Sequence, residues 1–70
     1  MTSITALQSH SLVVGINYDE GQDEYGLPVW DTSALTDIGW VHGRGNTAQE
    51  STNNAWREYI AAILRRFFKR

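Results

Sequence analysis

The C-terminal third of the chain has the spacing of an amphipathic helix. Large apolar residues recur there at intervals of four, three and four positions, at Trp56, Ile60, Ile63 and Phe67, and Tyr59, Leu64 and Phe68 widen this line into a stripe. A stripe of this width is typical of a helix that covers a sheet or another helix with one face. The pattern predicts one helix over residues 47–70.

The start of this helix has a capping signature. Thr47 precedes Glu50 by three positions, which is the capping-box pattern. Residues 51–54 are four poor helix formers in succession, so we expect either a frayed first turn or a start near residue 51. The face opposite the stripe is expected to be cationic, with Arg57, Arg65, Arg66 and Lys69.

The residues before the helix alternate between apolar and polar types, as in strands. The clearest stretch is residues 12–18, where Leu12, Val14, Ile16 and Tyr18 share one face. We expect this face to meet the helix. A second strand is predicted over residues 25–32, and Pro28 favours an edge position for it because proline lacks an N–H donor.

A third strand is predicted over residues 38–42, with Ile38 and Trp40 on the core side. Residues 31–37 are predicted as a connector and residues 43–46 as a tight turn into the helix. Residues 1–8 alternate weakly and fit either a fourth, edge strand or an ordered tail.

These elements predict a single small α+β domain over residues 1–70. Residues 1–46 form a three-stranded antiparallel sheet, or a four-stranded one if residues 1–8 join it, and residues 47–70 form the helix packed on it. Strands followed by one helix are typical of this class.

The short length of the chain limits the size of its hydrophobic core and hence the stability of the domain. A chain of 70 residues buries only about 60% of its unfolded surface. It has no cysteine, so neither a disulfide nor a thiolate metal site reinforces it. Pairing with a second copy, as a homodimer, is one way to add buried surface.

The beginning of the chain, residues 1–4, has no basic region followed by a long apolar run. No stretch approaches the 18 or so apolar residues of a membrane span. We therefore expect a protein of the cytoplasm, or of the host cytoplasm if a virus encodes it.

The net charge of −2 hides an uneven distribution. Residues 1–50 carry seven acidic side chains against Arg44 alone, a net charge of −6, whereas residues 51–70 have a net charge of +4. Such asymmetry suits the orientation of a charged partner.

Three features are candidates for binding. The first is an acidic hairpin tip with four carboxylates, Asp19, Glu20, Asp23 and Glu24, whose spacing does not fit an EF-hand loop. The second is Arg44 in a Gly-Arg-Gly turn, which lacks the Lys-Ser/Thr ending of a phosphate-binding loop. Arg44 is expected to contact either a carboxylate of a partner or one of the acidic residues of this chain. The third is Trp30, whose alternation away from Leu27 and Val29 makes it a candidate for an exposed aromatic anchor. Burial of Trp30 against the helix is the alternative, because Pro28 leaves the register of this strand open.

The chain has no catalytic, metal-binding or cofactor-binding signature. His10 and His42 lie in separate segments, and nothing in the sequence places Ser, His and Asp together. We therefore expect no enzyme activity and no cofactor.

The leading functional hypothesis is a protein-interaction module that acts as an inhibitor, adaptor or accessory subunit. Its expected binding residues are Asp19, Glu20, Asp23, Glu24, Trp30, Arg44, Arg57, Arg65 and Arg66. The alternative is nucleic-acid binding through the helix end, where cations and phenylalanines are interleaved. The pI near 5.5 disfavours that alternative.

Overall fold

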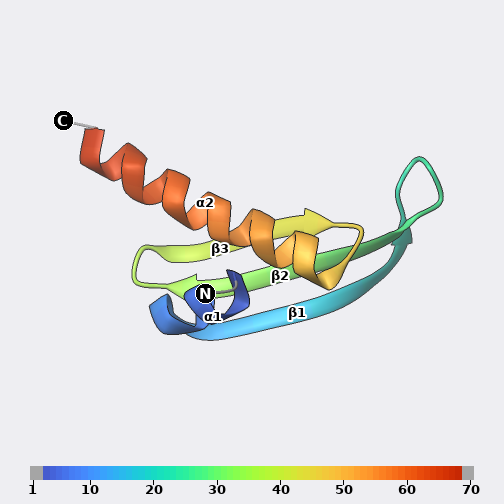
Figure 1. Cartoon of the computed structure of the whole chain (residues 1–70), viewed down its shortest axis with the longest axis horizontal. Coiled ribbons are helices and arrows are strands. Elements are labelled where there is room, and N and C mark those ends of the chain that lie inside the picture. Colours follow the sequence, from blue (N-terminus) through green and yellow to red (C-terminus); the bar gives the residue numbers. More distant parts are fainter. Residues whose placement is uncertain (1–2, 69–70) are drawn as a thin grey trace.

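The computed structural model describes residues 3–68, which form a three-stranded antiparallel sheet with two helices on one side (Figure 1). The elements follow in the order α1 (Ser3–His10), β1 (Ser11–Gln22), β2 (Pro28–Thr36), β3 (Gly39–Gly45) and α2 (Ala48–Phe68). Strand β2 lies between β1 and β3. The predicted α+β class, with three antiparallel strands followed by a C-terminal helix, is confirmed.

The N-terminal segment is a helix, so the alternative of a fourth strand over residues 1–8 is wrong; Met1 and Thr2 lie outside the described residues. Leu7 of α1 is fully buried and belongs to the core. His10 lies against Trp56 and Tyr59 of α2, with ring centroids 5.8 and 5.7 Å apart. Helix α1 therefore packs against α2, although the two helices lie at opposite ends of the sequence.

The bounds of all three strands differ from the predicted ones. Strand β1 extends beyond the predicted residues 12–18 at both ends, and β2 and β3 begin and end at later residues than predicted. The difference is largest for β2. Much of the predicted connector, residues 31–37, belongs to β2, where Thr32, Ala34 and Thr36 are buried. The prediction that Pro28 marks an edge strand is also wrong, because β2 is the central strand. Pro28 is its first residue, a position where the missing N–H disturbs the ladder least.

Helix α2 begins where the capping pattern places it. The backbone N–H of Glu50 donates to Thr47 Oγ1 at 3.0 Å, so Thr47 acts as the predicted N-cap. The helix starts at Ala48 rather than near residue 51.

The side of α2 that faces the sheet is not the predicted apolar stripe. Its buried residues are Ser51, Thr52, Ala55 and Tyr59, and Trp56 and Ile63 are only partly buried against the core. The rest of the stripe, Ile60, Leu64, Phe67 and Phe68, is exposed. Small side chains at the interface bring the first half of α2 close to the sheet, and the second half extends past the sheet (Figure 1).

Gly43 on β3 makes this close approach possible. A Cβ atom at Gly43 would overlap the backbone N of Ala55 and the backbone O of Ser51, and would lie 2.7 Å from the backbone C of Asn54. A Cβ at Gly45 would lie 2.6 Å from Glu50 Cγ. The predicted turn over residues 43–46 is therefore largely the end of strand β3, and its glycines provide the contact surface for α2.

Hydroxyl groups complete the interface between β2 and α2. Thr32 Oγ1 is 2.8 Å from Ser51 Oγ and 3.2 Å from Thr52 Oγ1. Ser51 and Thr52 also donate to the carbonyl of Ala48 at 2.9 and 2.7 Å. Because these buried hydroxyls are paired, placing them in the interior avoids the cost of an unsatisfied polar group.

The packing predicts that Gly43→Ala is strongly destabilising. The added methyl group meets helix backbone, which cannot move aside without lifting α2 from the sheet. We expect the free energy of unfolding to fall by at least about 2 kcal/mol, measured by urea denaturation.

Gly15→Ala on β1 is the matched control. A Cβ there would lie 3.9 Å from Asn17 Nδ2 and 4.0 Å from Ser33 O, which is ordinary contact. We expect its effect to stay within about 1 kcal/mol. Equal effects of the two substitutions would contradict the close packing of α2 on β3.

Candidate functional site

The side of the sheet turned away from the helices is covered by no element among residues 3–68. Side chains alternate between the two faces of a strand and paired residues share a face, so the register fixes which side chains lie there. We call this surface the open face. It comprises Val13, Gly15, Asn17 and Asp19 of β1, Val29, Asp31, Ser33 and Leu35 of β2, and Trp40, His42 and Arg44 of β3.

One end of the open face is apolar. Val13 pairs with Leu35, and Leu35 pairs with Trp40, so the three side chains form a row across the strands. Trp40 is 56% exposed and Val13 is 55% exposed. The indole of Trp40 stacks on His42, with ring centroids 6.4 Å apart and an interplanar angle of 14°.

The prediction that Trp40 belongs to the core is wrong. The buried side of β3 holds Val41 and Gly43, because α2 lies too close to this strand for a large side chain. Strict alternation then places Trp40 on the open face.

The other end of the open face is charged. Arg44 Nε donates to Asp31 Oδ1 at 2.9 Å, and Arg44 Nη2 donates to Asp19 Oδ2 at 2.6 Å. These contacts link all three strands. Ion pairs this exposed add little stability, so their main effect is to hold the guanidinium in one orientation.

The same contacts change the acidity of both partners. The pKa of Asp19 is lowered, first by the backbone N–H of Gly21, which donates to Asp19 Oδ1 at 3.0 Å, and next by Arg44. The pKa of Arg44 is raised, first by its hydrogen bond to Asp31 and next by that to Asp19. Both groups are therefore held in their charged forms.

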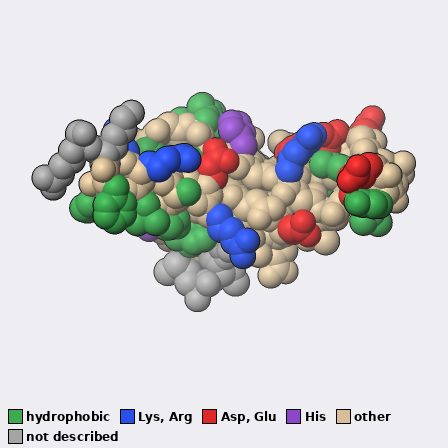
Figure 2. Space-filling model, turned by 90° about the horizontal axis from the view of Figure 1, so that it is seen from above, with side chains coloured by type: hydrophobic (Ala, Val, Ile, Leu, Met, Phe, Trp, Pro, Cys, Tyr) green, Lys and Arg blue, Asp and Glu red, His purple; other side chains and the backbone are tan. Residues whose placement is uncertain are grey.

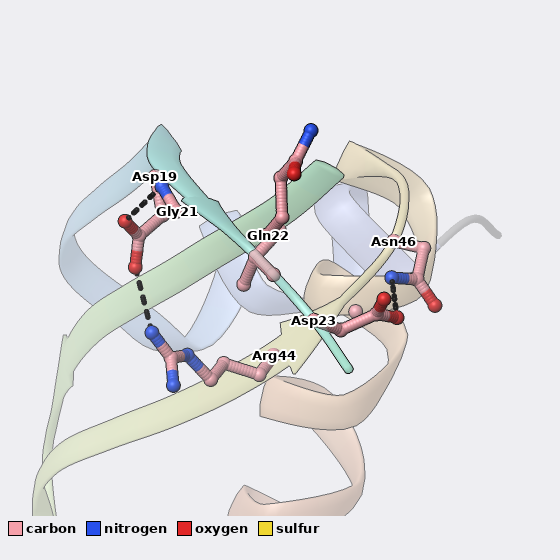
Figure 3. Close-up of a pocket in the computed structure, with 8 residues that line it drawn as sticks. Asp19, Gly21, Gln22, Asp23, Arg44 and Asn46 are labelled. Atoms are coloured by element: carbon pink, nitrogen blue, oxygen red, sulfur yellow. Dashed lines mark hydrogen bonds and ion pairs between the residues drawn. The ribbon is translucent and has the colours of Figure 1, made fainter. Parts of the chain in front are cut away.

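A shallow hollow of about 320 Å³ adjoins this charged end. Its lining includes Asp19, Asp23, Arg44 and Asn46 (Figure 3). The figure shows Asp19 and Arg44 directed toward each other across the hollow, whereas the side chain of Gln22 points away from that pair.

Asp23 organises the hairpin tip beside the hollow. Its Oδ1 accepts from the backbone N–H groups of Tyr25 and Leu27 at 2.8 and 2.9 Å. Asn46 Nδ2 donates to Asp23 Oδ2 at 2.9 Å and to the carbonyl of Pro28 at 3.0 Å. The pKa of Asp23 is lowered, chiefly by the N–H of Leu27. Asn46 thus ties the tip to the segment that precedes α2.

The structure brings together only part of the predicted binding set. Asp19 and Arg44 meet on the open face, with Asp31 as a third member that the sequence analysis did not select. Exposed Glu20 and Glu24 lie near them at the hairpin tip.

The other predicted residues lie elsewhere. Trp30 is half-buried on the helix side of the sheet, where it packs edge-on against Tyr18 with centroids 5.3 Å apart. Arg57, Arg65 and Arg66 are exposed on α2. The open face and the helix cations are therefore two separate surfaces.

Trp40, Val13 and Leu35 are the residues that sequence reasoning missed. The signal was present in β3, where residues 39, 43 and 45 are all glycine and share one side of the strand. A strand face made of glycines fits close backbone packing, which leaves the opposite side for Trp40, His42 and Arg44.

The potential reactive groups do not converge. Ser33 Oγ lies 3.0 Å from His42 Nδ1. A catalytic triad also needs a carboxylate bonded to the histidine, and no such hydrogen bond to His42 is found among residues 3–68. Over the same residues, no group of three or more His, Cys, Asp or Glu side chains is placed to hold a metal ion. No helix in the described part of the chain is long and apolar enough to cross a membrane.

Comparisons with protein-family models, with curated proteins and with solved structures gave no match to this chain. The functional argument therefore depends on the geometry of the chain itself.

The depressed pKa of Asp23 predicts a pH-dependent stability. A carboxyl group that is more acidic in the folded state stabilises the fold above its unfolded pKa, and this stabilisation is lost as the pH falls through the folded pKa. We expect the melting temperature of the wild type to fall as the pH is lowered from about 5 to about 3. In Asp23→Asn, this fall should be smaller and the melting temperature at neutral pH lower.

Glu24→Gln supplies the control, since it removes one carboxylate from the exposed neighbouring position. Its melting temperature should follow that of the wild type over the whole range. Identical pH profiles for Asp23→Asn and Glu24→Gln would contradict the assigned role of Asp23.

Proposed function

We propose that this protein is a small, non-catalytic interaction module that docks another protein on the open face of its sheet. The observation that supports this most is Trp40, a large aromatic side chain that is 56% exposed on a regular strand, beside Val13 and Leu35. Binding hot spots are enriched in tryptophan, and apolar residues bordered by polar ones are typical of interfaces.

The charges around this apolar row indicate the chemistry of the partner. The far end of the open face carries Asp19 and Asp31 against Arg44, and exposed Glu20 and Glu24 lie close by at the hairpin tip. A partner that presents an apolar side chain next to basic groups would complement both ends.

The proposed role is that of an inhibitor, adaptor or accessory subunit of a larger assembly. The proposed location is the cytoplasm, or that of a host cell if a virus encodes the chain. A composition without cysteine supports a reducing compartment.

An affinity experiment tests the docking proposal. Tagged wild type and Trp40→Ser are used as baits, and any protein that the wild type retains is purified and titrated against both by calorimetry. We expect Trp40→Ser to weaken binding at least about 30-fold, because loss of a central aromatic side chain typically costs 2 kcal/mol or more. Glu20→Lys/Glu24→Lys should weaken binding most at low salt.

Tyr25→Ser is the matched control, because Tyr25 is an aromatic residue that is 79% exposed but lies outside the open face. Its affinity should equal that of the wild type. The proposal fails if the wild type retains no protein, or if Trp40→Ser binds as tightly as the wild type.

Nucleic-acid binding through α2 is the second candidate. Arg65 and Arg66 are exposed and make no ion pair among residues 3–68. If this is the function, the wild type should retard single- or double-stranded DNA or RNA in a gel at low salt, and Arg65→Glu/Arg66→Glu should abolish the shift. No retardation at low salt would exclude it.

A further inference from the structure

Strand β1 has an outer edge with which no other strand among residues 3–68 pairs. The sheet order is β1-β2-β3, so β1 bonds to a strand on one side only. In an antiparallel sheet, alternate residues of an edge strand point their backbone N–H and C=O groups outward. The group that complements such a row is another extended backbone, which is why edge strands pair with strands of other chains.

The outer edge of β1 lacks the features that usually prevent such pairing. Residues 13–18 include no charged residue and no proline. Residues 13–19 pair one to one with β2, and the irregularities of β1 lie outside them, between Ser11 and Val13 and between Asp19 and Gln22. Native sheets commonly protect their edges with charges, prolines or bulges. We call residues 13–19 on this side of β1 the free edge.

The other edge strand, β3, is less suited to pairing. It contains three glycines and Arg44, and glycine in a strand weakens it while a charged residue opposes the addition of another strand. Helix α2 also packs closely on β3 at Gly43. The free edge of β1 is therefore the place where the sheet can be extended.

Apolar side chains near the free edge are left uncovered on the helix side of the sheet. Ile16 pairs with buried Thr32, which places Ile16 and Tyr18 on that side. They are nevertheless 38 and 53% exposed, because α2 lies chiefly over β3 and β2 (Figure 1). A strand added at the free edge would bring further side chains against them.

We propose that two copies of this chain pair through their free edges, antiparallel about a two-fold axis that passes through the sheet at Ile16. The two three-stranded sheets then become one sheet of six strands. Residues 13–19 of each copy face the same residues of the other, in the pairs Val13 with Asp19, Val14 with Tyr18, Gly15 with Asn17, and Ile16 with Ile16.

The backbone of the free edge fits this register. Each facing pair joins residues that are an even number of positions apart, or identical, so both have the same place in the alternation of the strand. Residues that point their N–H and C=O groups outward in one copy therefore meet outward-pointing residues of the other. About six to eight backbone hydrogen bonds result from these seven positions.

The side chains of the free edge suit a second copy. Ile16 meets Ile16 at the axis, and Val14 meets Tyr18, a β-branched and aromatic pair of the kind that stabilises neighbouring strands. No pair sets like charges together, so the segment is self-complementary, as a two-fold contact requires. A parallel arrangement would instead place Asp19 beside Asp19.

The distribution of charge over the molecule favours the same orientation. Figure 2 shows acidic side chains gathered toward one end of the long axis and hydrophobic ones toward the other. The acidic end is that of the β1–β2 hairpin, and exposed Arg65 and Arg66 lie toward the opposite end, on α2 (Figure 1). Antiparallel pairing separates the two acidic hairpins and brings each to the same end of the dimer as the cations of the other copy.

Analytical ultracentrifugation tests the proposal. The wild type should pass from monomer to dimer as its concentration rises. Ile16→Lys sets two like charges opposite each other at the axis, so it should raise the dissociation constant at least about tenfold. Ile60→Lys is the matched control, because Ile60 is also 38% exposed but lies on α2; it should dimerise like the wild type. Circular dichroism confirms that each variant is folded.

Two measurements test the register. Amide hydrogen exchange should show alternate residues of 13–19 gaining protection at concentrations that form the dimer, since the other residues already bond to β2. Because the chain has no cysteine, Ile16→Cys should form an interchain disulfide on oxidation. Tyr18→Cys should not, because the two Tyr18 positions lie about 13 Å apart along the strands.

The outcomes that would overturn the proposal are distinct. A wild type that stays monomeric at every concentration overturns it, as does a dimer that Ile60→Lys weakens as much as Ile16→Lys does. Equal cross-linking of Ile16→Cys and Tyr18→Cys overturns the antiparallel register. Protection of the β1 amides in a monomer bound to another protein would assign the free edge to an extended segment of that protein instead.

This pairing goes beyond the docking function of the open face and can fail separately from it. Trp40 lies on β3, away from the free edge. Trp40→Ser should therefore dimerise like the wild type, even though we expect it to lose affinity for a docked protein.

Discussion

The contact between strand β3 and the backbone of α2 sets the arrangement of the whole molecule. Gly43 lets the helix approach until only Ala, Ser and Thr side chains fit beneath its first half. Packing this close excludes large residues from the interface, since interiors leave no room for additional groups. The large side chain of Trp40 consequently lies on the open face rather than in the core.

Local sequence signals predicted the class of fold and several of its details. The Thr47 cap and the length of α2 follow from short-range chemistry, because an N-cap is completed within three residues. The alternation over residues 12–18 likewise places Val14 on the helix side of β1. These features depend on residues close together in the sequence and not on a distant element, and for that reason they could be predicted.

The parts that could not be predicted depend on the shape of a distant element. Hydrophobic periodicity places Phe67 on the core side of the helix, whereas Phe67 is 76% exposed. The residues of α2 that lie against the glycines of β3 include Ser51, which no apolar pattern selects. Helix α1 packs against α2 through His10, a contact that no local pattern contains. At the candidate site, the tip acids and Arg44 were selected for their charge, but the partnership of Arg44 with Asp31 requires the register of β2 and β3.

Helix α2 is anchored at one end and free at the other, which makes it a lever. From Ala55, which sits over Gly43, to Phe68 is about 20 Å, so a tilt of about 10° at the anchor moves the far end by about 3.5 Å. Tyr59 and Ile63 also contact the core, so the position of the two phenylalanines depends on these contacts together with the fit of the helix backbone against Gly43. A substitution at Gly43 or Ala55 would therefore change the direction of α2 and move the exposed side chains of Phe67 and Phe68, although neither residue contacts them.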